Sequence, residues 1–137
     1  MPRDAQQIED TRAWLTKAAL DLRAGEGDLT LEPPIPEDAM FHAQQAAEKV
    51  LKAFLAWYDE PFRKTHDLRE LGRQCVRIDP ALDTACSKAE ALTPFAWQFR
   101  YPEEPSAPSI QEAKEALALA REVYETILGR LPEEVRP

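Results

Sequence analysis

The stretch FHAQQAAEKVLKAF runs from Phe41 to Phe54, and it decides the fold because it predicts a helix with a broad apolar face. The same helix carries four polar residues opposite its main apolar face, at steps of three, four and three: His42, Gln45, Lys49 and Lys52. At about 100° per residue, these four side chains fall within roughly 80° of one another. The stripe is therefore either a solvated helix surface or the floor of a binding site.

The rest of the sequence also predicts helices. Val and Ile are few, alternation of polar and apolar residues is not sustained, and strong helix formers such as Ala, Leu, Glu and Arg dominate. We expect an all-α fold with four main helices and one short helix. The sequence shows no internal repeat and no second domain, so residues 1–137 are expected to form a single helical domain.

The first two helices have clear boundary signals. The first is expected from about Asp4 to Ala24, because Gly25 and Gly27 follow it. Pro36 suits the first turn of the second helix, which should extend to about Tyr58.

The middle of the chain predicts a short helix and a longer one. Thr65 can cap the short helix, at about 66–77. Pro80 opens the next helix, which should end near Arg100 and be kinked or shortened at Pro94.

The last helix begins with the S-x-x-E capping box of Ser109 and Glu112, after the stiff connector PEEPSAPS. Gly129 and Pro132 are expected to close it.

The second helix has apolar residues on two sides. Its main stripe comprises Ala43, Ala47, Val50, Phe54 and Trp57. A flanking stripe is formed by Phe41, Leu51 and Leu55. A helix of this kind is either central in a bundle or in contact with a second subunit, through this flank or through a neighbouring helix.

Charge is distributed unevenly along the chain. The net charge is −8, which argues against a general nucleic-acid coat. Residues 40–101, however, carry nine basic and eight acidic residues, whereas acids outnumber bases on both sides of this segment. An anionic ligand is therefore expected to bind within residues 40–101.

No apolar run approaches the roughly 20 residues of a membrane span, and the N-terminus lacks the apolar stretch of a signal peptide. We therefore expect a soluble, cytoplasmic protein without a membrane partner. Cys75 and Cys86 belong to no CxxC or Cys/His cluster and are expected to be reduced thiols.

Two further motifs carry candidate functional residues. In THDL, His66 lies at a predicted helix start, where it is either an exposed first-turn residue or a hydrogen-bond donor or proton carrier. In FRYP, Arg100 ends a helix, where a cation also complements the helix dipole, and Tyr101 offers a flat ring and a hydroxyl. Glu48 and Lys52 can form an i,i+4 pair on a solvated helix back.

Other chemical signatures are missing from the sequence. It has no phosphate-binding glycine loop and no G-x-S-x-G, and its two histidines are isolated. We therefore predict no metal site and no cofactor.

The order of these motifs resembles one known family. FHAQQAAEKVLKAFL, then THDLREL, then RYP and an Ala-rich last helix, resemble the HEPN family, the higher-eukaryote and prokaryote nucleotide-binding domain. The resemblance covers nearly the whole chain. It implies an up-and-down helical bundle and commonly a homodimer. Small prokaryotic members are often encoded beside a minimal nucleotidyltransferase, and some of these pairs act as toxin and antitoxin.

Many catalytic HEPN members are metal-independent RNases with an Arg-x(4–6)-His motif, and this sequence departs from that motif. Neither His42 nor His66 has an arginine five to seven positions before it, and Arg63 lies only three before His66. No histidine follows Arg100. Enzyme activity is therefore not the favoured expectation.

We expect a protein that binds a nucleotide or a nucleotidyltransferase partner. The predicted ligand-binding residues are His42, Gln45, Lys49, Lys52, His66, Arg100 and Tyr101. In this hypothesis Lys49, Lys52 and Arg100 hold phosphate. The alternatives are an RNase with a degenerate site that uses His66 with Arg63 or Arg100, and a structural partner subunit without a ligand.

Overall fold

Five α-helices make up the part of the chain that the computed structural model describes, residues 3–102 and 107–137. They are α1 (Ala5–Asp28), α2 (Pro36–Trp57), α3 (Leu68–Ile78), α4 (Asp83–Ala89) and α5 (Ile110–Leu128). Short 3-10 segments are η1 (Pro80–Leu82), η2 (Glu90–Ala96) and η3 (Glu133–Val135). These residues include no strand, which confirms the all-α prediction. Of the predicted connector, residues 103–106 lie outside the described part.

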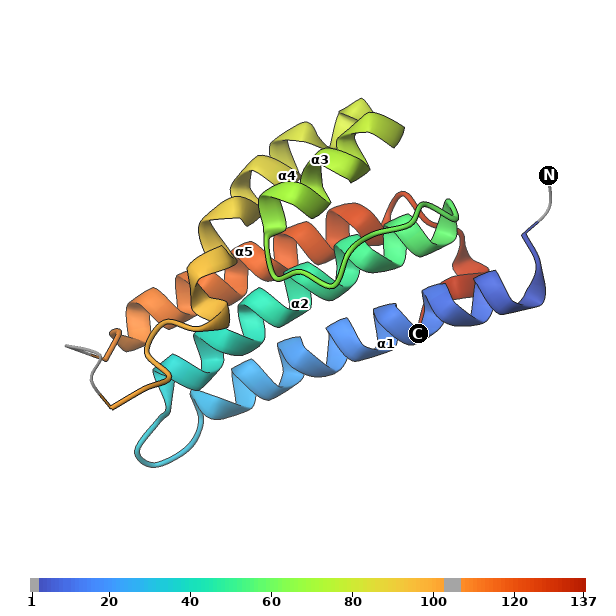
Figure 1. Cartoon of the computed structure of the whole chain (residues 1–137). Coiled ribbons are helices and arrows are strands. Elements are labelled where there is room, and N and C mark those ends of the chain that lie inside the picture. Colours follow the sequence, from blue (N-terminus) through green and yellow to red (C-terminus); the bar gives the residue numbers. More distant parts are fainter. Residues whose placement is uncertain (1–2, 103–106) are drawn as a thin grey trace.

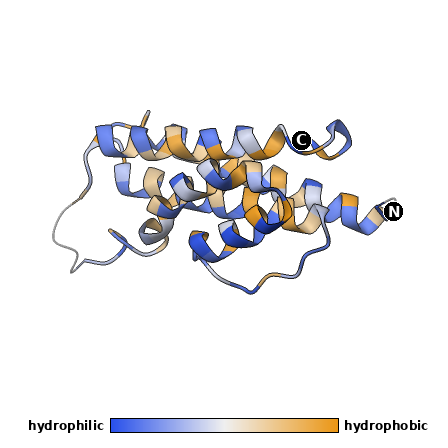
Figure 2. Ribbon diagram, turned by 90° about the horizontal axis from the view of Figure 1, so that it is seen from above, coloured by the Kyte–Doolittle hydropathy of each residue, from blue (hydrophilic) through white to orange (hydrophobic). Residues whose placement is uncertain are grey.

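Helix α2 is the centre of the bundle. Helices α1, α2 and α5 run side by side, and α3 and α4 pack against α2 and α5 (Figure 1). Hydrophobic and hydrophilic residues alternate along the helices (Figure 2), and the buried hydrophobic residues of all five helices form one core. The whole main stripe of α2 is buried, and so are Leu51 and Leu55 on its flank.

The burial of this flank decides between the two expectations for α2. Leu51 and Leu55 are both 0 % exposed within one chain, so they have no surface left for a second subunit. The prediction that α2 is central is confirmed. Of the predicted Phe41/Leu51/Leu55 flank, Leu51 and Leu55 cannot contact a partner, because other elements of the same chain already cover them. Phe41 is half-buried, so a contact through it or through a neighbouring helix stays a prediction.

Helix α1 is longer than predicted. It continues through Gly25 and Gly27 to Asp28. Neither glycine adopts the positive φ that a glycine has when it ends a helix. Gly25 lies where α1 approaches its neighbours closely. A Cβ atom there would lie 2.6 Å from Cδ2 of Leu117 and 3.3 Å from the carbonyl oxygen of Ala39. The glycine is therefore used for close packing and not as a helix stop.

Two boundaries in the middle of the chain also differ from the prediction. Asp67, not Thr65, caps α3, since its side chain accepts a hydrogen bond from the backbone N–H of Arg69. Helix α4 ends at Ala89 and continues as a 3-10 helix that contains Pro94 and ends at Ala96. The α-helix is therefore shorter than predicted, but it ends before Pro94, and the 3-10 helix that follows stops short of Arg100.

The capping box of Ser109 and Glu112 at the start of α5 is present, as predicted, and α5 ends just before Gly129. Cys75 and Cys86 are free and buried, which agrees with reduced thiols. Among the described helices, none is long and apolar enough to cross a lipid bilayer.

The two glycines of α1 give a matched test of this packing. A Cβ at Gly27 would contact nothing within 4 Å, so Gly27→Ala should raise the free energy of unfolding by about 0.5–1 kcal/mol through helix propensity. Gly25→Ala should gain less than Gly27→Ala, because its methyl group meets Leu117. Gly25→Val should cost about 1–3 kcal/mol through overpacking. Urea denaturation measures all three variants; equal effects of alanine at both positions would contradict the close approach at Gly25.

Candidate functional site

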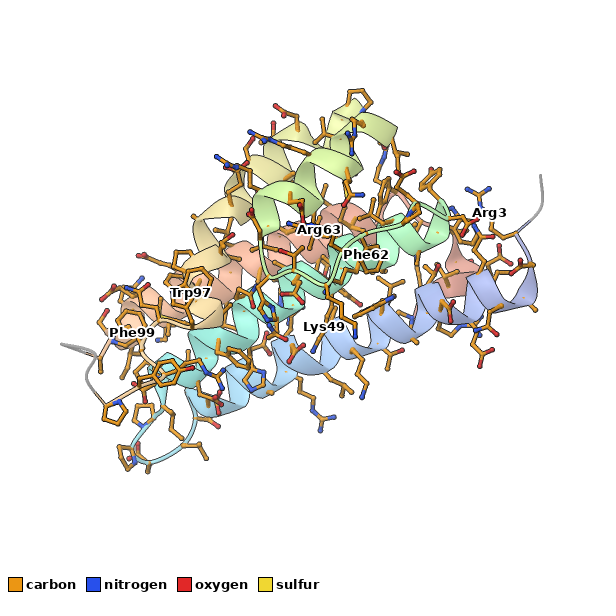
Figure 3. All side chains as sticks on the ribbon, in the orientation of Figure 1. Arg3, Lys49, Phe62, Arg63, Trp97 and Phe99 are labelled. Atoms are coloured by element: carbon orange, nitrogen blue, oxygen red, sulfur yellow. The ribbon has the colours of Figure 1, made fainter. Side chains whose placement is uncertain are left out.

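The polar stripe of α2 is largely covered by other elements, with Lys52 buried and the other three residues half-buried. Lys52 is 7 % exposed, and the side chains of His42 and Lys49 are about one-fifth exposed. Lys49 lies between α1 and α2, and Phe62 lies on the connector that follows α2 (Figure 3). The interpretation of a solvated helix back is therefore wrong, because α1 and the connector after α2 cover the stripe.

One buried acid of α1 binds two residues of the stripe. Asp21, 8 % exposed, accepts a hydrogen bond through Oδ1 from Nδ1 of His42 at 2.8 Å and one through Oδ2 from Nζ of Lys49 at 2.6 Å. We call Asp21, His42 and Lys49 the Asp21 cluster. It joins the middle of α1 to the first half of α2, and it compensates the charge of Lys49 within the fold.

Two more acids approach the other side of His42. Asp38, one turn before it in α2, lies 3.4 Å from Nε2 of His42. Asp28, the last residue of α1, lies beside Asp38. Burial, together with the proximity of Asp38, raises the pKa of Asp28 to about 6. Negative charge is therefore concentrated where α1 ends and α2 begins.

A second buried acid organises the middle of α2. Glu48 is 3 % exposed and accepts hydrogen bonds from Nδ1 of His66 at 2.7 Å, from Lys52 at 3.0 Å and from the side-chain amide of Gln44 at 3.1 Å. Gln44 also donates to the backbone carbonyl of His66. We call Gln44, Glu48, Lys52 and His66 the Glu48 cluster. It holds the connector after α2 against the middle of that helix.

Glu48 is ionised at neutral pH despite its burial. Burial alone would raise its pKa, but hydrogen bonds from His66, Lys52 and Gln44 outweigh that effect and hold the pKa below its ordinary value. An ionised carboxylate only accepts hydrogen bonds, so Nδ1 of His66 must carry the proton of their shared bond. In the neutral ring, Nε2 then has a free lone pair, so the ring can accept a proton or a hydrogen bond.

His66 is exposed although its anchor is buried. The connector after α2 folds back along that helix (Figure 1), and the side chain of His66 is 63 % exposed. A hollow of about 530 Å³ lies beside it, with walls that also include Arg69, Thr93 and the half-exposed ring of Trp97. This hollow adjoins a second one, of about 680 Å³, which Arg69 also lines. The second hollow carries three further arginines, namely Arg63, Arg73 and Arg77.

The remaining predicted residues lie apart from His66. Gln45 donates a hydrogen bond to the side chain of Gln44, at the edge of the Glu48 cluster. The guanidinium of Arg100 stacks 3.9 Å from the ring centroid of Phe41, and it lines a different hollow, beside the first turn of α2. Tyr101 is 58 % exposed. Within the described ranges, no hydrogen bond or ion pair joins Arg100 to His66 or to Lys49.

The structure thus divides the predicted set into three places. His42 and Lys49 belong to the Asp21 cluster, while Lys52 and His66 belong to the Glu48 cluster with Gln45 at its edge. Arg100 and Tyr101 lie elsewhere. The charges of Lys49 and Lys52 are compensated by Asp21 and Glu48, and Arg63 pairs with Glu70. This leaves Arg69, Arg73 and Arg77, which form no ion pair with another described residue, as the more available cations near His66.

Two key acids were not among the predicted site residues. Asp21 carried a signal, because it lies three residues after Ala18 and directly before Leu22, at the edge of the inward stripe of α1. Glu48 lies between the buried Ala47 and Val50, but its i,i+4 spacing to Lys52 fits a surface pair equally well. A buried Glu48 and an exposed Glu48–Lys52 pair can be told apart only by the path of the connector, which brings His66 to Glu48.

Comparison with known proteins identifies the family. A family model described as HEPN domain matches residues 11–131, so the chain belongs to the HEPN family. The crystal structure of TT1696 from Thermus thermophilus is similar to it, with 29 % sequence identity and a TM-score of 0.71. That match covers 88 % of this chain and 98 % of TT1696. No curated protein matches the chain.

The Glu48 cluster makes a prediction about stability. Glu48→Gln should lower the free energy of unfolding by about 3–5 kcal/mol, because it leaves the charge of Lys52 buried without its counter-ion. Combining it with Lys52→Met should recover much of this loss, since no uncompensated charge remains. Chemical denaturation of the two single variants and the double variant measures the coupling. A Glu48→Gln protein as stable as the wild type would contradict the cluster.

The same loss should depend on pH. The pKa of Glu48 in the folded protein lies below its ordinary value of 4.5, so its ionised form stabilises the fold above about that pH. This stabilisation is lost as the pH falls through the lowered folded-state pKa. The difference in stability between the wild type and Glu48→Gln should therefore be full at neutral pH and shrink under acid conditions. A difference that grew on acidification would contradict the assignment.

Proposed function

We propose that this HEPN-family protein binds the phosphate-bearing part of a nucleotide or of an RNA strand at the His66 surface, defined as His66, Arg69, Trp97 and the neighbouring arginines Arg63, Arg73 and Arg77. One observation carries the proposal. The buried Glu48 fixes the ring of His66 on the wall of a hollow that also presents a guanidinium, from Arg69, and an exposed aromatic ring, from Trp97.

These groups suit a nucleotide chemically. A guanidinium donates hydrogen bonds in a planar fork that matches phosphate oxygens. A half-exposed indole ring offers a face on which a base can stack, a contact worth about 1–3 kcal/mol in single-strand binding. Arg69, Arg73 and Arg77 recur every fourth residue along α3, so they fall on neighbouring turns about 6 Å apart. A row of this kind can contact successive phosphates.

The proposed binding site lies at a different place from the one expected from the sequence. Lys49 and Lys52 form internal ion pairs, which assigns them to the fold and removes them as the main phosphate ligands. His66 stays in the site. Arg100 lines the hollow near the start of α2, and the next residue, Tyr101, is exposed, so both could contact a second part of a longer ligand.

Family membership supports two further parts of the proposal. A minimal nucleotidyltransferase as a partner, in a toxin–antitoxin type pair, and a homodimer are both common for small prokaryotic HEPN proteins. The row of arginines on α3 would suit a nucleotide presented by such a partner. Leu51 and Leu55 are fully buried, so the half-buried Phe41 or a neighbouring helix would have to supply the dimer contact.

RNA binding is the direct test. Anisotropy of a labelled single-stranded RNA should show weak, salt-dependent binding, because phosphate contacts release counter-ions. Arg69→Ala and His66→Ala should each weaken it, and Arg69→Ala should also reduce the slope of log K against log salt by about 0.7. Arg23→Ala removes an equal charge from an exposed site on α1 and serves as the control. Equal losses in Arg69→Ala and Arg23→Ala would indicate general charge attraction and contradict the proposed surface.

An RNase is the second candidate, and the Glu48–His66 pair is what favours it. A carboxylate that orients a histidine leaves Nε2 able to take a proton from a 2′-hydroxyl. No arginine is well placed to hold the phosphate during cleavage, because Arg63 is exposed and paired with Glu70, and Arg100 stacks on Phe41. Loss of one electrostatic partner typically costs on the order of 10²–10³ in rate.

We therefore expect the isolated protein to cleave RNA poorly or not at all. The measurement is incubation with single-stranded RNA in EDTA, beside His66→Ala. Robust cleavage that disappears in the variant would place the nuclease first. Equal residual cleavage in both proteins would come from a contaminant, and binding would then remain the favoured function over cleavage.

A further inference from the structure

Three potential metal ligands converge where α1 ends and α2 begins. They are the carboxylates of Asp28 and Asp38 and the imidazole of His42, and one ligand atom from each lies within 4.8 Å of the others. Asp38 and His42 are one helical turn apart in α2, and Asp28 is brought to them by the loop between the two helices. The RNA-binding proposal uses none of these residues.

Among the described residues, no lysine or arginine forms an ion pair with Asp28 or Asp38, and the ion-pair partner that Asp38 has there is His42. Oδ2 of Asp28 is shielded from solvent, and no described residue donates a hydrogen bond to it. Asp28 also ends α1, where the helix dipole disfavours an acid, and the last turn of α1 contains no basic residue. Lys49 pairs with Asp21 and forms no ion pair with Asp28 or Asp38. A cation between the two carboxylates would relieve their repulsion.

His42 is oriented as metal-binding histidines usually are. Its Nδ1 is 2.8 Å from Oδ1 of Asp21, so the buried carboxylate accepts the Nδ1 proton. The lone pair of a neutral ring is then at Nε2, which lies 3.4 Å from Oδ2 of Asp38. A carboxylate behind a ligating histidine fixes its tautomer and raises its basicity. The hydrogen bond from His42 to Asp21 therefore holds the imidazole ring with Nε2 directed at the two carboxylates.

We infer that Asp28, Asp38 and His42 form a binding site for a divalent transition-metal ion, with Asp21 as the residue that positions His42. One nitrogen and two carboxylate oxygens are a mixed donor set that suits Zn²⁺, whereas Mg²⁺ and Ca²⁺ prefer oxygen ligands alone. Three protein ligands leave one position of a tetrahedral zinc ion open for water or another small ligand. A bound ion would also fasten the end of α1 to the start of α2.

The test is a zinc titration of protein first stripped with EDTA and then freed of the chelator. Calorimetry at neutral pH should give one zinc ion per chain, and NMR should show the Nε2 resonance of His42 shifting in step with binding. Asp38→Asn should raise the Kd at least about tenfold, and Asp21→Asn should raise it about 10–100-fold although Asp21 touches no metal. Asp38 is 44 % exposed at its side chain, so its variant tests the site even if the buried Asp21 variant does not fold.

The matched control is Glu26→Gln, which removes an acid near the same end of α1 that pairs with Arg121 instead. It should bind zinc as the wild type does, and zinc should raise the Tm of both proteins but not of Asp38→Asn. Absence of zinc binding, with Asp38→Asn more stable than the wild type, would mean that the two carboxylates merely share a proton. Zinc binding that leaves His42 unshifted, or a preference for Mg²⁺ or Ca²⁺, would equally overturn the inference.

Discussion

The position of His66 depends on one buried carboxylate, Glu48. An ionised acid in the middle of a central helix is costly unless every lone pair finds a donor. Lys52 and Gln44 provide donors from the same helix, and His66 completes the set from the connector. The connector must therefore fold back along α2 to satisfy Glu48, and this path delivers an imidazole to the surface beside Arg69 and Trp97.

The same logic operates at the α1–α2 contact. Asp21 is the counter-ion of Lys49 and the hydrogen-bond partner of His42, so it links the two helices through specific polar contacts as well as apolar packing. Such pairs contribute less to net stability than to the choice of a single alignment, because a shift of one helix would strand a buried charge. Gly25 permits the close approach that these contacts require. Residues of the fold are thus also residues of the sites. Asp21, which links α1 to α2, orients His42, and Glu48, which holds the connector, orients His66.

The sequence predicted the features that depend on residues close together in the chain, and it missed those that depend on contacts between distant segments. The apolar period of α2, the capping box of α5 and the proline at the start of α2 act within a few residues, and all three are confirmed. Gly25 misled the prediction because a glycine that ends a helix and a glycine that permits close packing look alike locally. The motif order identified the family, but it could not divide His42, Lys49, Lys52 and His66 between two acids, because Asp21 lies on another helix and His66 on a connector. Spacing likewise gave no metal site, since Asp28 reaches Asp38 and His42 only through the loop between the helices.

The central claim is that an ionised Glu48 fixes the tautomer of His66, and nitrogen NMR of the imidazole ring tests it most directly. In protein held above the pH at which His66 loses its charge, the account predicts a neutral ring with the proton on Nδ1 and a free lone pair on Nε2. The Nδ1–H resonance should also be protected from solvent exchange by its bond to the buried acid. A ring protonated on Nε2, or one that samples both forms equally, would mean that Glu48 does not hold His66.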